Sequence, residues 1–348
     1  MTGQPLRVGL IGLGDIQAVH SQAYRELEMV QVTAVCDLNP AVATRWAKEW
    51  ECEAFTSVEA CLASPDIDMV DLTLPHSIHY SVARMALEAG KHVLIEKPMA
   101  TRAQDAKELI ELAQTKHLLF TVAENTRFVY AYQVASEMLR NGQLGTVRLI
   151  RTLIYGTEVE RLSNPTLWKG RKDGTVGGVI MDSGPHSFYL LKWLNGEIDV
   201  VQALTNKVVE ASEVEDHAIV SGRFRNGGLF STEYTFTAEM PWGERLELYG
   251  TQGTLIIDQL SNPPAVLFTH HQDTGAVSHS YAGSPIKDIP YEPMLWKYRS
   301  IVDGVKDFVR AVQTQSQPSV DPWDGQYVLR VIEAAYESWT HDSRKIRV

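Results

Sequence analysis

The sequence predicts two domains of different fold class: an α/β domain on a doubly wound parallel sheet, then an α+β domain on a large open, mainly antiparallel sheet. At 348 residues the chain exceeds the length of one typical core. Short apolar strands alternate with helices up to about residue 124, which is typical of a parallel sheet. Beyond it, β-rich segments are joined by tight turns, which indicates antiparallel pairing. We therefore expect domains at 1–124 and 125–348.

Composition and charge indicate which kinds of protein and which partners the sequence favours. Hydrophobic residues make up 44% and charged residues 22%, as in soluble globular proteins. The formal charge of -11 argues against a nucleic-acid or membrane partner and favours a small neutral substrate. Cys36, Cys52 and Cys61 lack metal or disulfide spacing, which suits a reducing compartment. With no secretion signal before Leu6 and no apolar run of about 18 residues, a cytoplasmic location is expected.

A glycine turn follows the first strand. The apolar strand at 6–11 leads directly into Gly12 and Gly14, and a helix is expected from about 16 to 29. Gly12 would allow a tight turn, and Gly14 would let the backbone approach a pyrophosphate at the helix N-terminus. The third glycine of the usual dinucleotide pattern is missing, because Gln17 stands there.

An acidic residue ends the second strand. The strand at 30–36 is followed by Asp37, 25 positions after Gly12. A carboxylate there can bind both ribose hydroxyls of an adenosine and repels a 2′-phosphate, so NAD is preferred over NADP. The alternative is a helix cap, because Asn39 and Pro40 open the next helix. The glycine turn upstream favours the cofactor role.

The rest of the first domain continues the alternation and completes a Rossmann-type sheet. Helices are expected at 39–49, 57–63, 77–89 and about 101–116, and strands at 68–74, 92–95 and 118–123. His79 follows the strand at 68–74, so it borders the edge of the sheet where ligands bind. It either touches the cofactor or is a packed, hydrogen-bonded histidine.

A lysine stands at the carboxyl end of another strand. The strand at 92–95 is followed by Glu96, Lys97 and Pro98, and the proline ends the strand because it lacks a backbone donor. Lys97 is thus held at the ligand-binding edge of the predicted sheet. Taken alone, the tripeptide would favour an ordinary surface lysine in a loop.

The second domain carries antiparallel signals. A helix is expected at 131–141, strands at 147–155 and 200–209, hairpins at 218–236 and 245–258, and helices at 301–313 and 326–340. The last helices have the amphipathic pattern of structural elements, and they could pack back on the first domain. An open sheet leaves one face to be covered, so a homodimer or homotetramer through this sheet is expected.

One helix of the second domain carries an acid and a histidine. Asp182 and His186 are four residues apart, so both project from one helix face and can form a general acid–base pair. The alternative is an N-terminal cap at Asp182 and a satisfied, partly buried His186. Gly184 and Pro185 are poor helix residues, and their presence argues against mere helix building.

The loop at 168–174 could contact a substrate. Trp168 could stack on a sugar face, and Arg171 or Lys172 could bind hydroxyls, although a solvated loop is the simpler interpretation for each residue. The segment 261–290 offers no chemistry. Its histidines at 270, 271 and 279 lack carboxylate or cysteine partners at metal spacing, so no metal is expected.

In their order along the chain, these motifs resemble the Gfo/Idh/MocA oxidoreductases, the family of glucose–fructose oxidoreductase and inositol dehydrogenase. The resemblance covers nearly the whole chain, and the ordered set is highly specific. Its motifs are the glycine turn with His20, Asp37, Thr73-Leu74-Pro75 with His79, Gly90-Lys91-His92-Val93, Glu96-Lys97-Pro98 and Asp182-Ser183-Gly184-Pro185-His186.

The resemblance implies a two-domain fold, a bound nicotinamide cofactor, and oxidation or reduction of a carbohydrate or cyclitol hydroxyl. The family's catalytic lysine, aspartate and histidine correspond to Lys97, Asp182 and His186. Two positions depart from the family pattern, which has an asparagine where His76 stands and often an acid where Tyr189 stands. These departures bear on nicotinamide contacts and substrate choice.

The complete expected site has two sets of residues and no metal. Cofactor-binding residues are expected to be Gly12, Gly14, Asp15, Ile16, Asp37, Thr73, Pro75, His76, His79, Glu96, Lys97 and Asn125. Substrate-binding residues are expected to be Lys97, Arg127, Trp168, Arg171, Lys172, Asp182 and His186.

The expected activity is that of an NAD-dependent dehydrogenase acting on a secondary hydroxyl of a sugar, sugar derivative or cyclitol. His186 would remove the hydroxyl proton, Asp182 would orient its imidazole, and Lys97 would hydrogen-bond the reacting oxygen. Lys97 could instead be the acid–base group, because a lysine beside a cationic nicotinamide loses its proton more easily. Two alternatives are an enzyme that retains NAD and performs elimination, hydrolysis or epimerisation through transient oxidation, and a non-catalytic NAD-sensing regulator.

Overall fold

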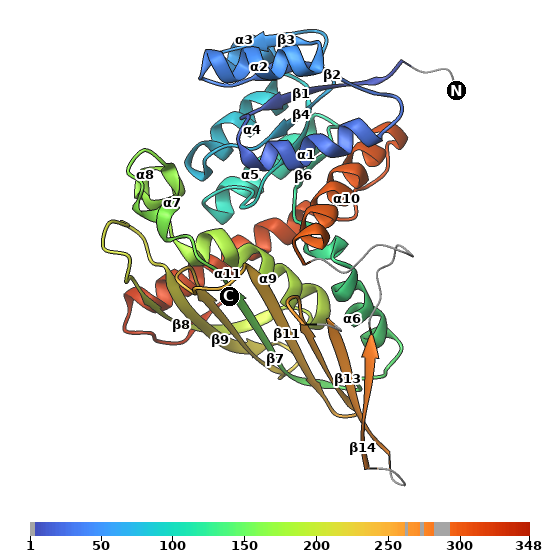
Figure 1. The fold of residues 1–348 in the computed structure, drawn as a ribbon, viewed down its shortest axis with the longest axis vertical. Coiled ribbons are helices and arrows are strands. Elements are labelled where there is room, and N and C mark those ends of the chain that lie inside the picture. The colour runs from blue at the N-terminus through green and yellow to red at the C-terminus, as the bar shows by residue number, and fades with distance from the viewer. Residues whose placement is uncertain (1–3, 262–263, 272–274, 282–292) are drawn as a thin grey trace. The chain divides into compact units, whose positions relative to one another are not determined.

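The computed structural model describes residues 4–261, 264–271, 275–281 and 293–348 (Figure 1). The chain divides into two compact units. The first unit comprises Met1–Asn125 and Ile301–Leu329, and the second comprises Thr126–Ser300 and Arg330–Val348. None of the described helices combines the length and the apolar character needed to cross a membrane.

The first unit contains a parallel sheet, as predicted, and this sheet has six strands. Its strands are β1 (Leu6–Ile11), β2 (Val30–Cys36), β3 (Glu53–Phe55), β4 (Met69–Leu72), β5 (His92–Ile95) and β6 (Phe120–Val122). They lie in the order β3-β2-β1-β4-β5-β6, and every neighbouring pair is parallel. The chain reverses its direction of winding between β1 and β4, so the carboxyl ends of these two strands form the topological switch point where ligands bind in such sheets.

Helices link these strands and bury the apolar sheet. They are α1 (Asp15–Glu26), α2 (Pro40–Trp50), α3 (Val58–Leu62), η1 (His76–Ile78), α4 (His79–Glu88) and α5 (Ala103–Thr115). The helix α10 (Pro293–Thr314) adds Val305, Phe308 and Val309 to the core around Val8 and Leu10. The three-residue strand β3 was not predicted, since it is short and largely exposed.

The second unit contains a large open sheet that is mainly antiparallel, as predicted, and this sheet has nine strands. Its strands are β7 (Val147–Tyr155), β8 (Ile198–Asn206), β9 (His217–Phe224), β10 (Leu229–Thr235), β11 (Gly243–Gly250), β12 (Gly253–Asp258), β13 (Ala265–His271), β14 (Gly275–Tyr281) and β15 (Ile346–Arg347). Their order is β14-β13-β12-β11-β7-β10-β9-β8-β15. β7 and β10 pair in parallel, with Leu149 opposite Leu229.

The second unit contains the helices α6 (Tyr130–Arg140), α7 (Val159–Ser163), η3 (Trp168–Gly170), α8 (Lys172–Thr175) and α9 (Val179–Asn195), and the turn η2 (Asn125–Phe128) precedes them. The helix α11 (Pro322–Thr340) belongs to the first unit up to Leu329 and to the second unit from Arg330. Figure 1 shows α9 laid along one face of the sheet, where it packs on β7, β9 and β10. Accordingly, Ile150 and Ile154 of β7 are buried, whereas Arg148 and Arg151 of the same strand are exposed.

Candidate active site

The glycine turn has a geometry that suits a dinucleotide. Gly12 has a φ of +86°, and a Cβ there would lie 2.3 Å from the carbonyl oxygen of Thr73, so only glycine fits. A Cβ at Gly14 would meet nothing within 4 Å, and no side chain caps α1 at this residue. The backbone at Gly14 is therefore open on its Cβ side and the first turn of α1 has no side-chain cap at this residue, which fits the approach of the NAD pyrophosphate.

Asp37 ties the end of β2 to the glycine turn. Its Oδ2 accepts a hydrogen bond from the backbone N–H of Leu13 at 3.0 Å, and its Oδ1 accepts one from Asn39 at 2.8 Å. Asn39, not Asp37, caps α2 through the N–H of Ala41. Each oxygen of the Asp37 carboxylate can still accept a further hydrogen bond, as binding of a ribose diol requires.

Gln17 replaces the third glycine by joining a buried polar cluster. It is fully buried, and its Nε2 donates to Asp71 Oδ2 at 3.2 Å. The hydroxyl proton of Thr73 is shared between Gln17 Oε1 at 3.0 Å and the carbonyl oxygen of Gly12 at 2.6 Å. The longer side chain is thus accommodated by hydrogen bonds at the carboxyl ends of β1 and β4.

His79 is the packed histidine of the two alternatives. It is fully buried, with Nδ1 2.7 Å from the carbonyl oxygen of Pro98 and Nε2 2.8 Å from that of Leu74. Burial lowers the pKa of His79. Both ring nitrogens face backbone carbonyls, which leaves neither nitrogen for a cofactor. His76 is also buried, with its ring edge against His79.

The carboxylate of Glu96 is engaged by the protein itself. Its Oε1 lies 3.0 Å from His20 Nε2, and its Oε2 accepts the backbone N–H of Lys97 at 3.0 Å. Glu96 is buried, whereas Lys97 is half-buried at the end of β5. The sequence predicts that Glu96 binds the cofactor. Because its two carboxylate oxygens bind His20 and the backbone N–H of Lys97, we expect its effect on the cofactor to be indirect.

His20 and Asp71 are missing from the predicted site, yet they occupy the centre of this cluster. His20 is fully buried, with Nδ1 3.0 Å from Asp71 Oδ2, and Tyr24 also donates to Asp71 at 2.9 Å. Burial opposes the charged imidazole, but Asp71 and Glu96 outweigh it and raise the pKa of His20 to about 10. An ionisable residue inside the apolar strand β4 was the available signal.

In the second unit, Glu215 caps the helix that carries the acid–histidine pair. Its carboxylate accepts the N–H groups of Gly178 at 3.0 Å and Ile180 at 3.3 Å, and it accepts the hydroxyl of Tyr336 at 2.6 Å. Burial raises the pKa of Glu215. Since the N-terminus of α9 is capped in this way, Asp182 is not its cap, and that part of the alternative is wrong.

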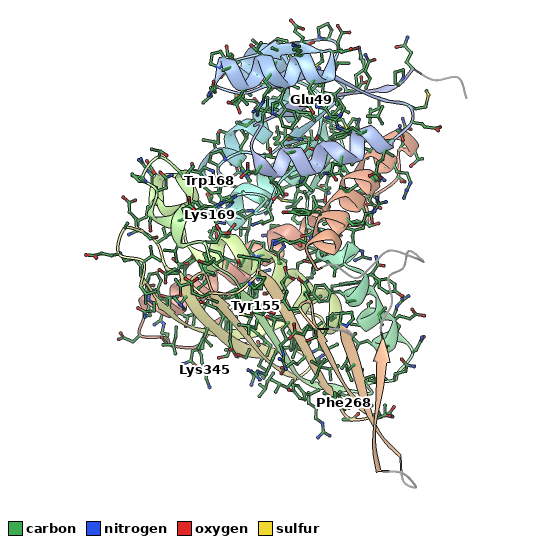
Figure 2. All side chains as sticks on the ribbon, in the orientation of Figure 1. Glu49, Tyr155, Trp168, Lys169, Phe268 and Lys345 are labelled. Carbon is green, nitrogen blue, oxygen red and sulfur yellow. The ribbon has the colours of Figure 1, made fainter. Side chains whose placement is uncertain are left out.

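Asp182 instead forms an ion pair with a lysine. Lys169 Nζ lies 3.2 Å from Asp182 Oδ2 and 3.1 Å from Glu158 Oε2, and it stands 5.2 Å from the ring centre of Phe236. The three charged side chains are only 12–17% exposed. His186 follows Asp182 by one turn of α9 and is half-buried. Figure 2 labels Lys169 and Trp168 on the segment before α9.

The other loop residues have individual partners. Arg171 is exposed and pairs with Asp173 at 2.7 Å, which matches the solvated-loop alternative. The backbone N–H of Lys172 donates to Glu213 at 2.9 Å. Arg127 stands 5.3 Å above the ring of Trp193. The sequence does not single out Lys169 among the basic residues of its loop, because spacing alone cannot show which loop cation meets a buried carboxylate.

No group of three or more His, Cys, Asp or Glu side chains that could hold a metal exists among the residues that the structure describes. The side chains of residues 270, 271 and 279, from which no metal site was expected, lie outside that part of the chain. Cys36, Cys52 and Cys61 are free thiols.

Comparisons with known proteins agree with this geometry. Residues 6–124 match the GFO/IDH/MocA family described as "Oxidoreductase family, NAD-binding Rossmann fold", and residues 132–256 match the GFO/IDH/MocA C-terminal domain. A dTDP-3,4-didehydro-2,6-dideoxy-alpha-D-glucose 3-reductase of Saccharopolyspora spinosa is 30% identical over 75% of this chain and 77% of its own. The levoglucosan dehydrogenase of Pseudarthrobacter phenanthrenivorans is 26% identical over 98% and 97%.

A solved structure shares the fold. The complex of a levoglucosan dehydrogenase with NADH and L-sorbose superimposes with a TM-score of 0.89 at 23% identity, covering 99% of each chain. The predicted fold class and family are thereby confirmed. On these matches and on the geometry of its glycine turn, the chain belongs to the Gfo/Idh/MocA oxidoreductases and binds NAD through an N-terminal Rossmann domain.

Proposed function

We propose that this oxidoreductase is an NAD-dependent dehydrogenase that oxidises or reduces a secondary hydroxyl of a sugar, sugar derivative or cyclitol. The observation that carries the proposal is the half-buried His186 one helical turn after Asp182, whose carboxylate is paired with Lys169 instead of capping α9. A histidine beside a fixed carboxylate suits proton transfer from an alcohol near neutral pH. The names of the two relatives above, a sugar dehydrogenase and a nucleotide-sugar reductase, support this substrate class.

The proposed binding of NAD uses the glycine turn and the acid after β2. Gly12 and Gly14 would accept the pyrophosphate, and Asp37 would accept the ribose hydroxyls, which favours NAD over NADP. Bound NAD supplies the hydride acceptor or donor. The other predicted cofactor residues, apart from His79, keep their assignment within this proposal.

The proposed proton chemistry divides the work among three residues. His186 removes the proton of the substrate hydroxyl during oxidation, and Asp182 orients the imidazole. Lys97 donates a hydrogen bond to the reacting oxygen. The reverse division, with Lys97 as the acid–base group and His186 as the positioning residue, stays open to test.

Lys169 and Trp168 complete the proposed substrate side. The ammonium group of Lys169 lies between the carboxylates of Glu158 and Asp182, so it fixes the orientation of Asp182. Trp168 is half-buried beside it and would stack on the apolar face of a sugar ring. Arg127, Arg171 and Lys172 remain candidates for contacts with substrate hydroxyls.

The open face of the nine-stranded sheet supports a homodimer or homotetramer. Leu204 of β8 and Ile219 of β9 lie directly opposite each other and are 60% and 49% exposed. Farther along, Arg151 pairs with Glu233 and Glu247. A surface that carries an exposed apolar pair and ion-paired charges is suited to contact with a second copy of this chain. The cytoplasmic location expected from the sequence belongs to the same proposal.

A substrate screen tests the function. Purified protein is mixed with a panel of sugars, sugar derivatives and cyclitols, with NAD and separately with NADP, and absorbance is followed at the reduced-nicotinamide band. Reduction of NAD by one class of polyol is expected. One retained NAD per subunit, with turnover that needs no added cofactor, would instead show internal recycling. Tight NAD binding with no reduction across the panel would point to a regulatory role.

A further inference from the structure

A continuous chain of hydrogen bonds, buried in its middle and partly buried at both ends, joins the glycine turn to the backbone of Lys97. Its links, from one end to the other, are Gly12 O to Thr73 Oγ1 (2.6 Å), Thr73 Oγ1 to Gln17 Oε1 (3.0 Å), Gln17 Nε2 to Asp71 (3.2 Å), Asp71 to His20 Nδ1 (3.0 Å), His20 Nε2 to Glu96 Oε1 (3.0 Å) and Glu96 Oε2 to Lys97 N (3.0 Å). All of these residues lie in the first unit. The chain joins a turn that binds NAD to a residue proposed for catalysis.

We propose that His20 and Glu96 are positioning residues that fix Lys97 relative to the NAD-binding glycine turn. The inference rests on the proposed function, because it concerns the placement of Lys97 for the reaction. Neither residue needs to touch substrate or cofactor in this role. They act through the main chain of Lys97, whose N–H Glu96 holds.

The hydrogen-bonding capacity of each group requires this arrangement. Both nitrogens of His20 lie 3.0 Å from carboxylate oxygens, which only accept hydrogen bonds, so both nitrogens must donate. The imidazole is therefore charged and bridges Asp71 and Glu96. Its pKa of about 10 agrees with this state. Because a charge-assisted hydrogen bond is about twice as strong as a neutral one, the bridge is stiff.

Glu96 is the link that no neutral residue of the same shape can replace. It accepts from His20 with one oxygen and from the backbone of Lys97 with the other. A glutamine has one accepting oxygen and one donating nitrogen, so it can satisfy His20 or Lys97 but not both. The variant Glu96→Gln thus breaks the chain at its last step while it preserves the side-chain volume.

Stability alone does not account for these groups. Two carboxylates and one imidazolium are buried where β4 and β5 end, and such ion pairs often add no more stability than apolar packing would. Removing one partner is costly, however, because it leaves a buried charge without compensation. The buried charges therefore hold these side chains in one arrangement. The last hydrogen bond of that arrangement fixes the backbone of Lys97.

The test compares Glu96→Gln and His20→Gln with Tyr24→Phe. Tyr24 is a matched control because it donates to the same Asp71 carboxylate from an equally buried site but lies off the chain to Lys97. Four quantities are measured: kcat and KM for the best polyol, the Kd of NADH by fluorescence, the rate of Lys97 acylation with NADH bound by peptide mass spectrometry, and the melting temperature.

The two chain variants are expected to lose kcat by about 10- to 100-fold, as a small misplacement of a reacting group does. Their KM for the polyol and Kd for NADH should stay within about threefold of the wild-type values, whereas their Lys97 acylation rate should change by more than about threefold. The control variant Tyr24→Phe should match the wild type in all four measurements. The proposal is overturned if Tyr24→Phe loses as much kcat, if NADH affinity falls in step with kcat, or if the melting temperature alone changes.

If His20→Gln does not fold, Glu96→Gln alone decides, since it keeps every other bond of the chain. If the wild-type protein turns over no polyol, the proposed function fails. NADH affinity and Lys97 acylation in the same variants then still decide whether the chain positions Lys97.

Discussion

Lys169 Nζ lies 3.2 Å from Asp182 Oδ2, and this ion pair ties the loop before α9 to the carboxylate that precedes His186 by one turn. The same nitrogen lies 3.1 Å from Glu158. Glu215, and not Asp182, accepts the backbone N–H groups of Gly178 and Ile180 at the start of α9. The Asp182 carboxylate is held in one orientation by a cation, which suits a residue that orients a histidine.

The first prediction concerns this ion pair. Lys169→Met should lower kcat by about 10- to 100-fold, because Asp182 loses its fixed orientation while the apolar stem of the side chain is retained. Steady-state kinetics with the best polyol measures the loss. Arg161→Met is the control, since Arg161 is a half-exposed partner of the same Glu158 at 3.9 Å. Equal losses in both variants would mean that Glu158, and not Asp182, transmits the effect.

Much of the fold could be predicted from local patterns. Strands of a buried parallel sheet are continuous apolar runs, and their helices carry one apolar stripe, so the first unit follows from periodicity. The hairpin of β13 and β14 was not predicted, because its segment is rich in Ser, Gly and His. The parallel pairing of β7 with β10 depends on contacts between distant segments, which no local pattern contains.

The candidate site, like the fold, could be predicted from the sequence only in part. Gly12, Asp37 and Lys97 stand in short motifs at element ends, and Asp182 and His186 form a short motif within α9, so the sequence alone could indicate them. The partners that hold them come from far along the chain: His20 meets residues 51 and 76 positions away. The role of Lys169 could not be predicted for a different reason: it depends on which carboxylate the loop contacts in the folded protein.

The second prediction concerns cofactor choice. Asp37→Asn should lower kcat/KM for NAD by about tenfold, because a charge-assisted hydrogen bond to ribose is lost, and should raise the relative use of NADP. The ratio of kcat/KM for the two cofactors measures the switch. Glu49→Gln removes an exposed charge from α2 and should leave the ratio unchanged. Parity between NAD and NADP in the wild type would refute the role of Asp37.

The third prediction separates Lys97 from His186. In the direction of oxidation, the rate rises with pH as the catalytic base loses its proton. His186→Asn should abolish this rise, whereas Lys97→Met should keep it at a lower overall rate. Profiles of kcat/KM against pH for both variants measure the difference. If the rise disappears in the lysine variant alone, Lys97 is the base and His186 the positioning residue.

The fourth prediction concerns assembly. Ile219→Glu should weaken self-association by about tenfold or more, because a charge would be buried opposite Leu204 in the interface. Sedimentation velocity over a concentration series measures the shift. Met29→Glu changes an equally exposed apolar residue of the first unit and should leave the oligomer intact. A wild-type protein that is monomeric at every concentration would exclude the proposed assembly through the sheet.

The fifth prediction concerns the pH dependence of stability. His20 has a pKa of about 10 in the folded protein and an ordinary value of 6.5 when unfolded, so folding favours its protonated form. Its contribution to the free energy of unfolding, on the order of a few kcal/mol, is complete below pH 6.5 and is lost as pH rises towards 10.

The comparison of wild type with His20→Gln isolates this contribution, because groups common to both proteins cancel. The difference in melting temperature between the two should be largest near pH 6 and should shrink steadily up to pH 10. Thermal unfolding in a series of buffers measures it. Tyr24→Phe, which keeps His20 between its carboxylates, should show a difference from wild type that does not vary with pH below the titration of tyrosine. A constant difference for His20→Gln as well would mean that His20 is neutral in the folded protein, and the charged bridge to Glu96 would then be refuted.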